Sequence, residues 1–165
     1  MVNILKVNDK IEILKAFLSI IIAEGIGILS VYVGNADSKI YEALEKPVIA
    51  PTSYIFIIVW PILYLLIGLA AYRIWEWKKQ DRYENGTLKL YSFQLFLNFL
   101  WPILFFRFRL YGLAFVELLV LIIFILLTTF HFFRQDRLSG FLMIPYIICN
   151  SFAAVLNFAL WFLNC

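Results

Sequence analysis

Amide side chains stand at helical spacing inside two strongly apolar stretches of the chain. Gln94 and Asn98 are four residues apart, and Asn150 and Asn157 are seven apart, so each pair falls on one face of a helix. An amide in lipid is costly unless it faces protein or water, so these faces are expected to point into a helix bundle. A few amides around an apolar hollow suit a flat hydrophobic ligand. The alternative is that they only join neighbouring helices, a contact worth about 1 kcal/mol each.

Aromatic residues extend the same faces. Trp60 and Tyr64 are one turn apart in a further apolar stretch, while Trp101 and Phe105 continue the stripe that contains the Gln94 pair. Ala153, between the two asparagines of the last stretch, is small enough to leave space or to admit a close neighbour. We expect these three stripes to meet around the interior of the bundle and to form a binding pocket.

Two carboxylates lie within apolar stretches and allow two interpretations. Glu24 and Glu117 either couple a proton to the transport of a small molecule or fix helix packing as neutral or amide-paired acids. Glu24 also lies beside a ridge of small residues, Ser19, Ala23 and Gly27. Such a ridge lets two helices approach closely, within one chain or across a dimer.

Residues that hold metals or act as nucleophiles are sparse. His131 is the only histidine, which excludes a haem held by two histidines of one chain, and we interpret it as a membrane-interface residue. Cys149 and Cys165 lack metal-ligand spacing and are expected to be unpaired thiols. There is no phosphate-binding loop and no plausible Ser-His-Asp set, so the sequence predicts no metal site and argues against a hydrolase or an ATP-driven pump.

The composition is that of a membrane protein. Of the 165 residues, 64% are hydrophobic and only 15% are charged, against about 25% in a typical soluble domain. The mean hydropathy is +0.89. These values exclude a soluble globular domain, a disordered tail and a disulfide scaffold. The net charge of +3 is modest and its basic residues are not gathered in a patch, so no nucleic-acid surface is expected.

Five apolar stretches are each long enough to cross a bilayer as a helix. We therefore predict an all-α, integral membrane bundle of five transmembrane helices, forming a single domain over residues 1–165. The predicted helices cover residues 11–33, 53–75, 88–106, 112–133 and 140–163.

The connection over residues 34–52 is the longest, and long loops in compact proteins are often functional. Its middle, residues 38–45, predicts two helical turns with Ser38 as the N-cap. The pair Lys46-Pro47 would end that helix, and Pro51 prepares the entry to the next long helix. We interpret this loop as a lid over the pocket.

Basic residues predict the orientation in the membrane, because they concentrate on the cytoplasmic side. Ten lie on one side of the predicted helices and four on the other. The N-terminus is therefore expected in the cytoplasm and the C-terminus outside, in a bacterial plasma membrane. The ten are Lys6, Lys10, Lys15, Arg73, Lys78, Lys79, Arg82, Lys89, Arg134 and Arg137, and the four are Lys39, Lys46, Arg107 and Arg109.

Three motifs in collinear order resemble the translocator protein family, whose bacterial members are called tryptophan-rich sensory proteins, or TspO. The resemblance covers roughly residues 38–158. The motifs are Lys46-Pro47-Val48-Ile49-Ala50-Pro51 with Phe56, Val59-Trp60, Leu63-Tyr64 and Gly68-Leu69-Ala70-Ala71-Tyr72; Gln94-Leu95-Phe96-Leu97-Asn98-Phe99-Leu100-Trp101-Pro102 with Phe105-Phe106; and Pro145-Tyr146 with Phe152-Ala153 and Leu156-Asn157.

The resemblance implies a five-helix bundle, usually a homodimer, surrounded by membrane lipid. It also implies a receptor or sensor that binds porphyrins, such as protoporphyrin IX or haem, or sterols in a pocket under the loop, with transport of the ligand as a further activity. The porphyrin would be a ligand, and no cofactor is required. The pocket would draw on Tyr41, Pro51, Trp60, Tyr64, Gln94, Asn98, Trp101, Phe105, Cys149, Ala153 and Asn157. Tyr41 and Pro51 rest on the resemblance alone.

A second activity follows from the same resemblance. Some bacterial members break down protoporphyrin in light, with pocket tryptophans implicated, which would make this chain an enzyme with Trp60 as the reacting residue. A helix-five aromatic, often tryptophan, that members commonly carry is Cys149 in this chain. The departure bears on the enzyme interpretation more than on ligand binding, because indole oxidation needs an indole beside the macrocycle.

Overall fold

A computed structural model describes residues 5, 7, 12–78 and 86–164 of the chain. Over these residues it contains five helices that are long and apolar enough to cross a membrane. They confirm the predicted all-α membrane bundle. The elements are α1 (Ile13–Gly34), α2 (Ser38–Glu42), α3 (Ser53–Lys78), α4 (Thr87–Pro102), a π-helical turn η1 (Ile103–Arg107), α5 (Tyr111–Gln135) and α6 (Arg137–Leu163).

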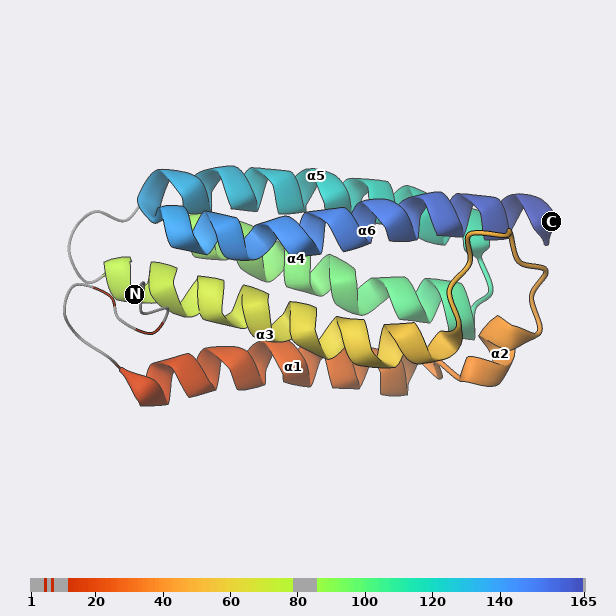
Figure 1. Ribbon diagram of the computed structural model, residues 1–165, viewed down its shortest axis with the longest axis horizontal. Coiled ribbons are helices and arrows are strands. Elements are labelled where there is room, and N and C mark those ends of the chain that lie inside the picture. Colours follow the sequence, from red (N-terminus) through yellow and green to blue (C-terminus); the bar gives the residue numbers. More distant parts are fainter. Residues whose placement is uncertain (1–4, 6, 8–11, 79–85, 165) are drawn as a thin grey trace.

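The long helices run side by side along one axis (Figure 1). Helix α1 packs mainly on α3, α4 lies between this pair and α5, and α5 and α6 make the most extensive helix contact. The short helix α2 and the loop around it lie at the end of the bundle where α6 finishes (Figure 1). The loop of residues 34–52 therefore covers one end of the bundle, as a lid would.

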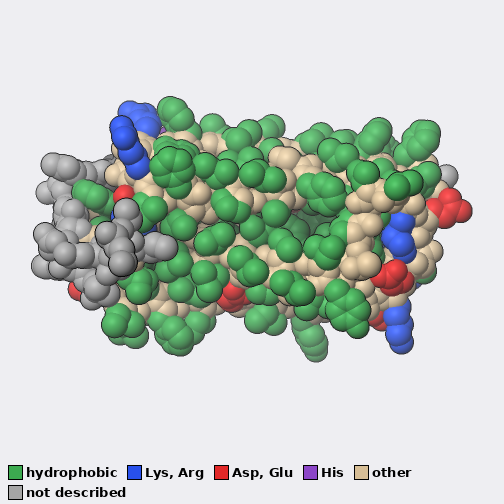
Figure 2. Space-filling model, viewed as in Figure 1, with side chains coloured by type: hydrophobic (Ala, Val, Ile, Leu, Met, Phe, Trp, Pro, Cys, Tyr) green, Lys and Arg blue, Asp and Glu red, His purple; other side chains and the backbone are tan. Residues whose placement is uncertain are grey.

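Apolar side chains cover the outside of the bundle as well as its core, because the outer face meets hydrocarbon rather than water. Green apolar side chains dominate the visible face in Figure 2, and most charged groups on that face lie near the two ends. Phe17, Ile57 and Phe130, on three different helices, are all more than half exposed. Buried positions repeat along one face of each helix, which is what an interior lined by amphipathic stripes requires.

The predicted helix boundaries are close to those observed, with two corrections. Helix α6 begins at Arg137, three residues before the predicted start, because the Asp136 side chain accepts a hydrogen bond from the Ser139 backbone N–H at 2.9 Å and caps the helix. In the loop, Asp37 rather than Ser38 is the N-cap of α2, and the helix ends at Glu42. A side chain with two carboxylate oxygens at the preceding position displaces the serine from the capping role.

The small-residue ridge on α1 packs inside the chain. Ser19, Ala23 and Gly27 are all buried, and the Ser19 hydroxyl donates to the Gly68 carbonyl of α3 at 2.8 Å. A Cβ on Gly27 would lie 2.5 Å from the Tyr64 ring. Of the two predicted uses of this ridge, the structure shows the contact within one chain.

Ion pairs join the helices at the end opposite the lid. The Lys15 ammonium on α1 lies 2.7 Å from Glu76 on α3, and Arg73 on α3 lies 2.6 Å from Asp136, which alone separates α5 from α6. Burial by itself would raise the pKa of Asp136, but hydrogen bonds from Arg73 and Ser139 together with the Arg73 charge lower it below its usual value. Of the basic residues used to predict orientation, Lys6, Lys10, Lys79 and Arg82 lie outside the described residues.

Candidate ligand site

The loop folds onto the bundle through Tyr41, which the family resemblance had singled out. The ring of Tyr41 is buried and packs edge-on against Phe56 of α3, with ring centroids 5.4 Å apart. Its hydroxyl donates to the Pro51 carbonyl at 2.9 Å, so the two residues predicted from the resemblance contact each other. Burial, followed by the nearby Glu42 charge, raises the pKa of the Tyr41 hydroxyl, which stays a hydrogen-bond donor at neutral pH.

Further contacts hold the loop closed on itself. The Lys46 ammonium lies 3.2 Å from the Glu42 carboxylate and also donates to the Glu42 carbonyl at 2.8 Å. The Ser53 backbone N–H, at the start of α3, donates to Glu42 at 3.4 Å. Hydrogen bonds from Ser53 and Lys46 hold the pKa of the Glu42 carboxyl below its usual value. Glu42 was not among the predicted site residues. Its spacing to Lys46 was a usable signal, because an acid four residues before a lysine forms a helical ion pair.

A side chain from the end of α6 fastens the loop to the bundle. The Asn164 amide donates to the Glu45 carbonyl and accepts from the Glu45 backbone N–H, both at 3.0 Å. This two-way contact joins segments 119 residues apart. Sequence reasoning missed Asn164, because its partner is backbone and no residue type in the loop marks the contact.

Asn164→Ala is expected to loosen the loop without unfolding the bundle. Each lost hydrogen bond contributes about 1 kcal/mol, so amide hydrogen exchange at Glu45 should accelerate on the order of tenfold. Exchange measured by mass spectrometry in detergent checks this. Glu45→Ala is the matched control, because Asn164 contacts only the backbone of that residue. Equal exchange in wild type and Asn164→Ala would contradict the contact.

Beneath the loop, the predicted amides join helices to one another. The Asn98 amide of α4 donates to the Tyr64 hydroxyl of α3 at 2.8 Å. The Trp101 indole N–H donates to the Asn157 carbonyl oxygen at 3.0 Å, and the Asn157 amide donates to the Tyr111 carbonyl at 2.8 Å. The structure thus brings all four predicted side chains together from α3, α4 and α6, and it realises the interhelical contacts foreseen as the alternative to ligand contacts.

Aromatic rings fill the space next to these amides. Trp101 stacks on Phe105 with ring centroids 5.0 Å apart, and Phe105 contacts Tyr111 edge-on at 5.0 Å. Phe105 lies in η1, the π-helical turn that begins directly after Pro102, and is 1% exposed. The Phe105 ring therefore lies inside the bundle. Turns of this kind are often found at functional sites.

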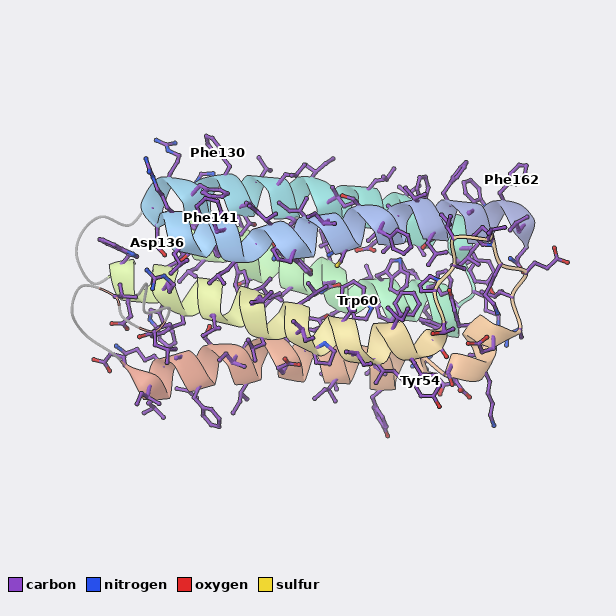
Figure 3. The ribbon with its side chains drawn as sticks, in the orientation of Figure 1. Tyr54, Trp60, Phe130, Asp136, Phe141 and Phe162 are labelled. Carbon is purple, nitrogen blue, oxygen red and sulfur yellow. The ribbon has the colours of Figure 1, made fainter. Side chains whose placement is uncertain are left out.

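Trp60 borders a hollow in the side of the bundle. Its ring is half-buried and lies 6.5 Å from that of Tyr64, centroid to centroid. Figure 3 shows Trp60 projecting from α3 toward α6, and Figure 2 shows the surface hollowed in the same region.

The remaining predicted site residues, Ala153, Cys149 and Gln94, differ in burial and in hydrogen bonding. Ala153 is buried in the same core as Tyr64, and Cys149 is a free, half-buried thiol that packs against that core. Gln94 is completely buried, and neither its amide nitrogen nor its oxygen has a hydrogen-bond partner within the described part of the chain.

The predicted interface histidine lies away from the candidate site. His131 is half-buried near the end of α5, and together with the first turns of α4 it lines an open cleft of about 470 Å³. The position agrees with an interface residue. The lining residues are Gly86, Lys89, Leu90, Phe93, Phe124 and His131.

These features define a class: an integral membrane bundle of five spanning helices with an aromatic and amide-lined site beneath a long first loop. The chain belongs to the TspO/MBR family, whose model matches residues 18–162.

Relatives from different domains of life share most of the chain. A tryptophan-rich protein TspO of Archaeoglobus fulgidus is 34% identical over 93% of this chain and 99% of its own length. A tryptophan-rich sensory protein of Cereibacter sphaeroides is 34% identical over 75% of this chain and 76% of its own. The human translocator protein is 31% identical over 79% of this chain and 78% of its own. The resemblance inferred from three motifs is confirmed.

Proposed function

We propose that the protein is a membrane receptor or sensor that binds a porphyrin, or another flat hydrophobic molecule such as a sterol, at the candidate site. The observation that carries the proposal is the convergence of indole, phenol and amide groups from α3, α4 and α6 beneath the closed loop. The rings offer flat apolar surface, and the amides offer hydrogen bonds to a polar edge of the ligand.

The energetics suit a ligand of this kind. Burying each aromatic side chain against a ligand contributes about 1.5 to 3 kcal/mol, and micromolar affinity requires about 8 kcal/mol. Trp60 and Trp101, which are only partly buried, therefore supply part of the required sum, and burial of the ligand's own apolar surface supplies the rest. Part of that gain is offset. To bind the amides, the ligand must break the hydrogen bonds between Asn98 and Tyr64 or between Trp101 and Asn157 and replace them with its own.

Protoporphyrin IX titrated into the purified protein in detergent is expected to quench tryptophan fluorescence with a micromolar dissociation constant. Trp60→Ala removes one aromatic contact worth about 1.5 to 3 kcal/mol and should weaken binding roughly 10- to 100-fold. The matched control is Trp75→Ala, since Trp75 lies on the same helix but is 36% exposed. Equal affinities for Trp60→Ala and wild type would refute the site.

Two other activities are alternative proposals, and each depends on particular residues. Light-driven porphyrin breakdown would use Trp60, and illumination of the protoporphyrin complex, with free pigment in detergent as reference, tests it. Proton-linked transport would use Glu24 or Glu117, and flux into proteoliposomes should then fall in Glu24→Gln or Glu117→Gln. The homodimer, the bacterial plasma membrane and the cytoplasmic N-terminus stay predictions of the sequence.

A further inference from the structure

Buried polar groups without partners gather in the middle of the bundle. Within the described residues, eight side-chain atoms on α4, α5 and α6 are buried and make no hydrogen bond; one is the Gln135 amide oxygen at the end of α5, and the other seven belong to five residues further inside the helices. The seven are the Tyr91 hydroxyl, both amide atoms of Gln94, both carboxyl oxygens of Glu117, the Tyr146 hydroxyl and the Asn150 amide oxygen. We call these five residues the central polar cluster. Each unpaired buried group of this kind costs about 1 to 3 kcal/mol, so a folded protein rarely leaves several together.

The members of the cluster lie on the buried faces of three helices: Tyr91 and Gln94 on α4, Glu117 on α5, and Tyr146 and Asn150 on α6. Tyr91 and Tyr146 belong to one buried core, and the Asn150 amide donates to the Tyr146 carbonyl at 2.8 Å. Gln94 follows Tyr91 by one turn of α4 and shares its inward face. The unpaired atoms therefore belong to side chains that three helices turn toward the inside of the bundle.

The cluster is separate from the amide ties of the candidate site but adjoins them. Asn98, one turn along α4 from Gln94, already donates to Tyr64. Gln94, Tyr146 and Asn150 are each 0% exposed, so bulk water and lipid headgroups do not reach them from the bundle surface.

We propose that the central polar cluster is an internal hydration site, in which ordered water molecules link Gln94, Glu117, Tyr146 and Asn150. Water is the guest whose chemistry fits, because it both donates and accepts. The cluster presents acceptors at Asn150 and donors at Gln94, with hydroxyls that serve as either. A buried water typically makes about three hydrogen bonds to groups of this kind. A carboxyl group in either protonation state has lone pairs that such water satisfies.

The sign of a stability change distinguishes a hydrated cluster from a dry one. Gln94→Met and Asn150→Leu nearly preserve shape while they remove polar atoms. If water satisfies the cluster, each substitution strands water or a neighbouring group and lowers the thermal midpoint in detergent by about 3 °C or more. If the cluster is dry, Gln94→Met removes only unpaired amide atoms and raises the midpoint. Asn150→Leu then raises it by less, because it also removes the Asn150 hydrogen bond to the Tyr146 carbonyl. Leu95→Met, a buried apolar position on the same helix, controls for the cost of repacking.

A second measurement uses the unaltered protein and does not depend on how the variants fold. Water-edited solid-state NMR on the protein in lipid bilayers should show rapid polarisation transfer from water to the Gln94 side-chain amide. The Leu95 methyl groups on the same helix should receive it slowly. A raised midpoint in both variants, or no early transfer at Gln94, would overturn the proposal. Both tests are made without porphyrin, so they are independent of the proposed function.

Discussion

Asp136→Ala is expected to lower the free energy of unfolding by about 3 to 4 kcal/mol. The side chains of Asp136 and Arg73 are only 10% and 7% exposed, and two hydrogen bonds join them, at 2.6 and 3.1 Å. Removing the carboxylate takes two charge-assisted hydrogen bonds from a buried guanidinium. It also removes the cap of α6, because the same carboxylate accepts from the Ser139 backbone and hydroxyl.

Unfolding in detergent, followed by circular dichroism, measures the loss. Asp37→Ala is the matched control: Asp37 also caps a helix, but it is exposed and makes no ion pair among the described residues. That control should cost about 1 kcal/mol or less. If the two variants lose equal stability, the Arg73 contact contributes nothing.

The same pair predicts how stability depends on pH. The pKa of Asp136 is lower in the folded protein than the ordinary value of an aspartate, which the unfolded chain keeps. The unfolded chain therefore takes up the proton first as the pH falls. The stabilisation is complete above the unfolded pKa and is lost as the pH falls through the folded pKa. Unfolding measured between pH 7 and pH 2 should show this acid loss in wild type, and a smaller loss in Asp136→Asn.

Gly27→Leu is expected to lower both the stability of the protein and its affinity for a porphyrin, because Gly27 packs against a residue of the candidate site. A Cβ at Gly27 lies 2.5 Å from the Tyr64 ring, so any side chain pushes the ring aside. Tyr64 then loses its position beside Asn98. Overpacking of this kind costs about 1 to 3 kcal/mol, and loss of the hydrogen bond adds about 1 kcal/mol. Porphyrin affinity should fall roughly tenfold.

The chain provides a control two residues away. Gly25 lies on the same helix with no atom within 4 Å of an added Cβ. Gly25→Leu should therefore keep wild-type porphyrin affinity and gain up to about 1 kcal/mol of stability from better helix propensity. Thermal unfolding and fluorescence titration on both variants make the comparison. A Gly27→Leu protein with wild-type stability would contradict the close packing of α1 on α3.

The number and type of spanning helices followed from the sequence because lipid imposes a simple rule: long apolar runs must be helical. Trp60, Tyr64, Asn98, Trp101 and Asn157 were identified in the same way, since a polar or indole group in such a run points inward. Their partners did not follow. That Asn98 meets Tyr64 and that Trp101 meets Asn157 depends on helix rotation and tilt, which periodicity alone does not determine.

Contacts made with backbone were the least visible. Asn164 holds the main chain of Glu45, and Ser19 donates to the Gly68 carbonyl, so neither partner carries a residue type that marks it. The early start of α6 had a local signal, an aspartate before a helix-forming run, which the predicted start at residue 140 did not take into account. For the two backbone contacts, in contrast, the missing information was tertiary.

The turn at Asp136 has a consequence for how the protein enters the membrane. Only one residue separates α5 from α6, so the connection is too short for the two helices to insert into the membrane separately. They are expected to insert together as a helical hairpin. The hairpin also brings the Asp136 carboxylate to the Arg73 guanidinium of α3, so their ion pair forms only after this turn has been synthesised.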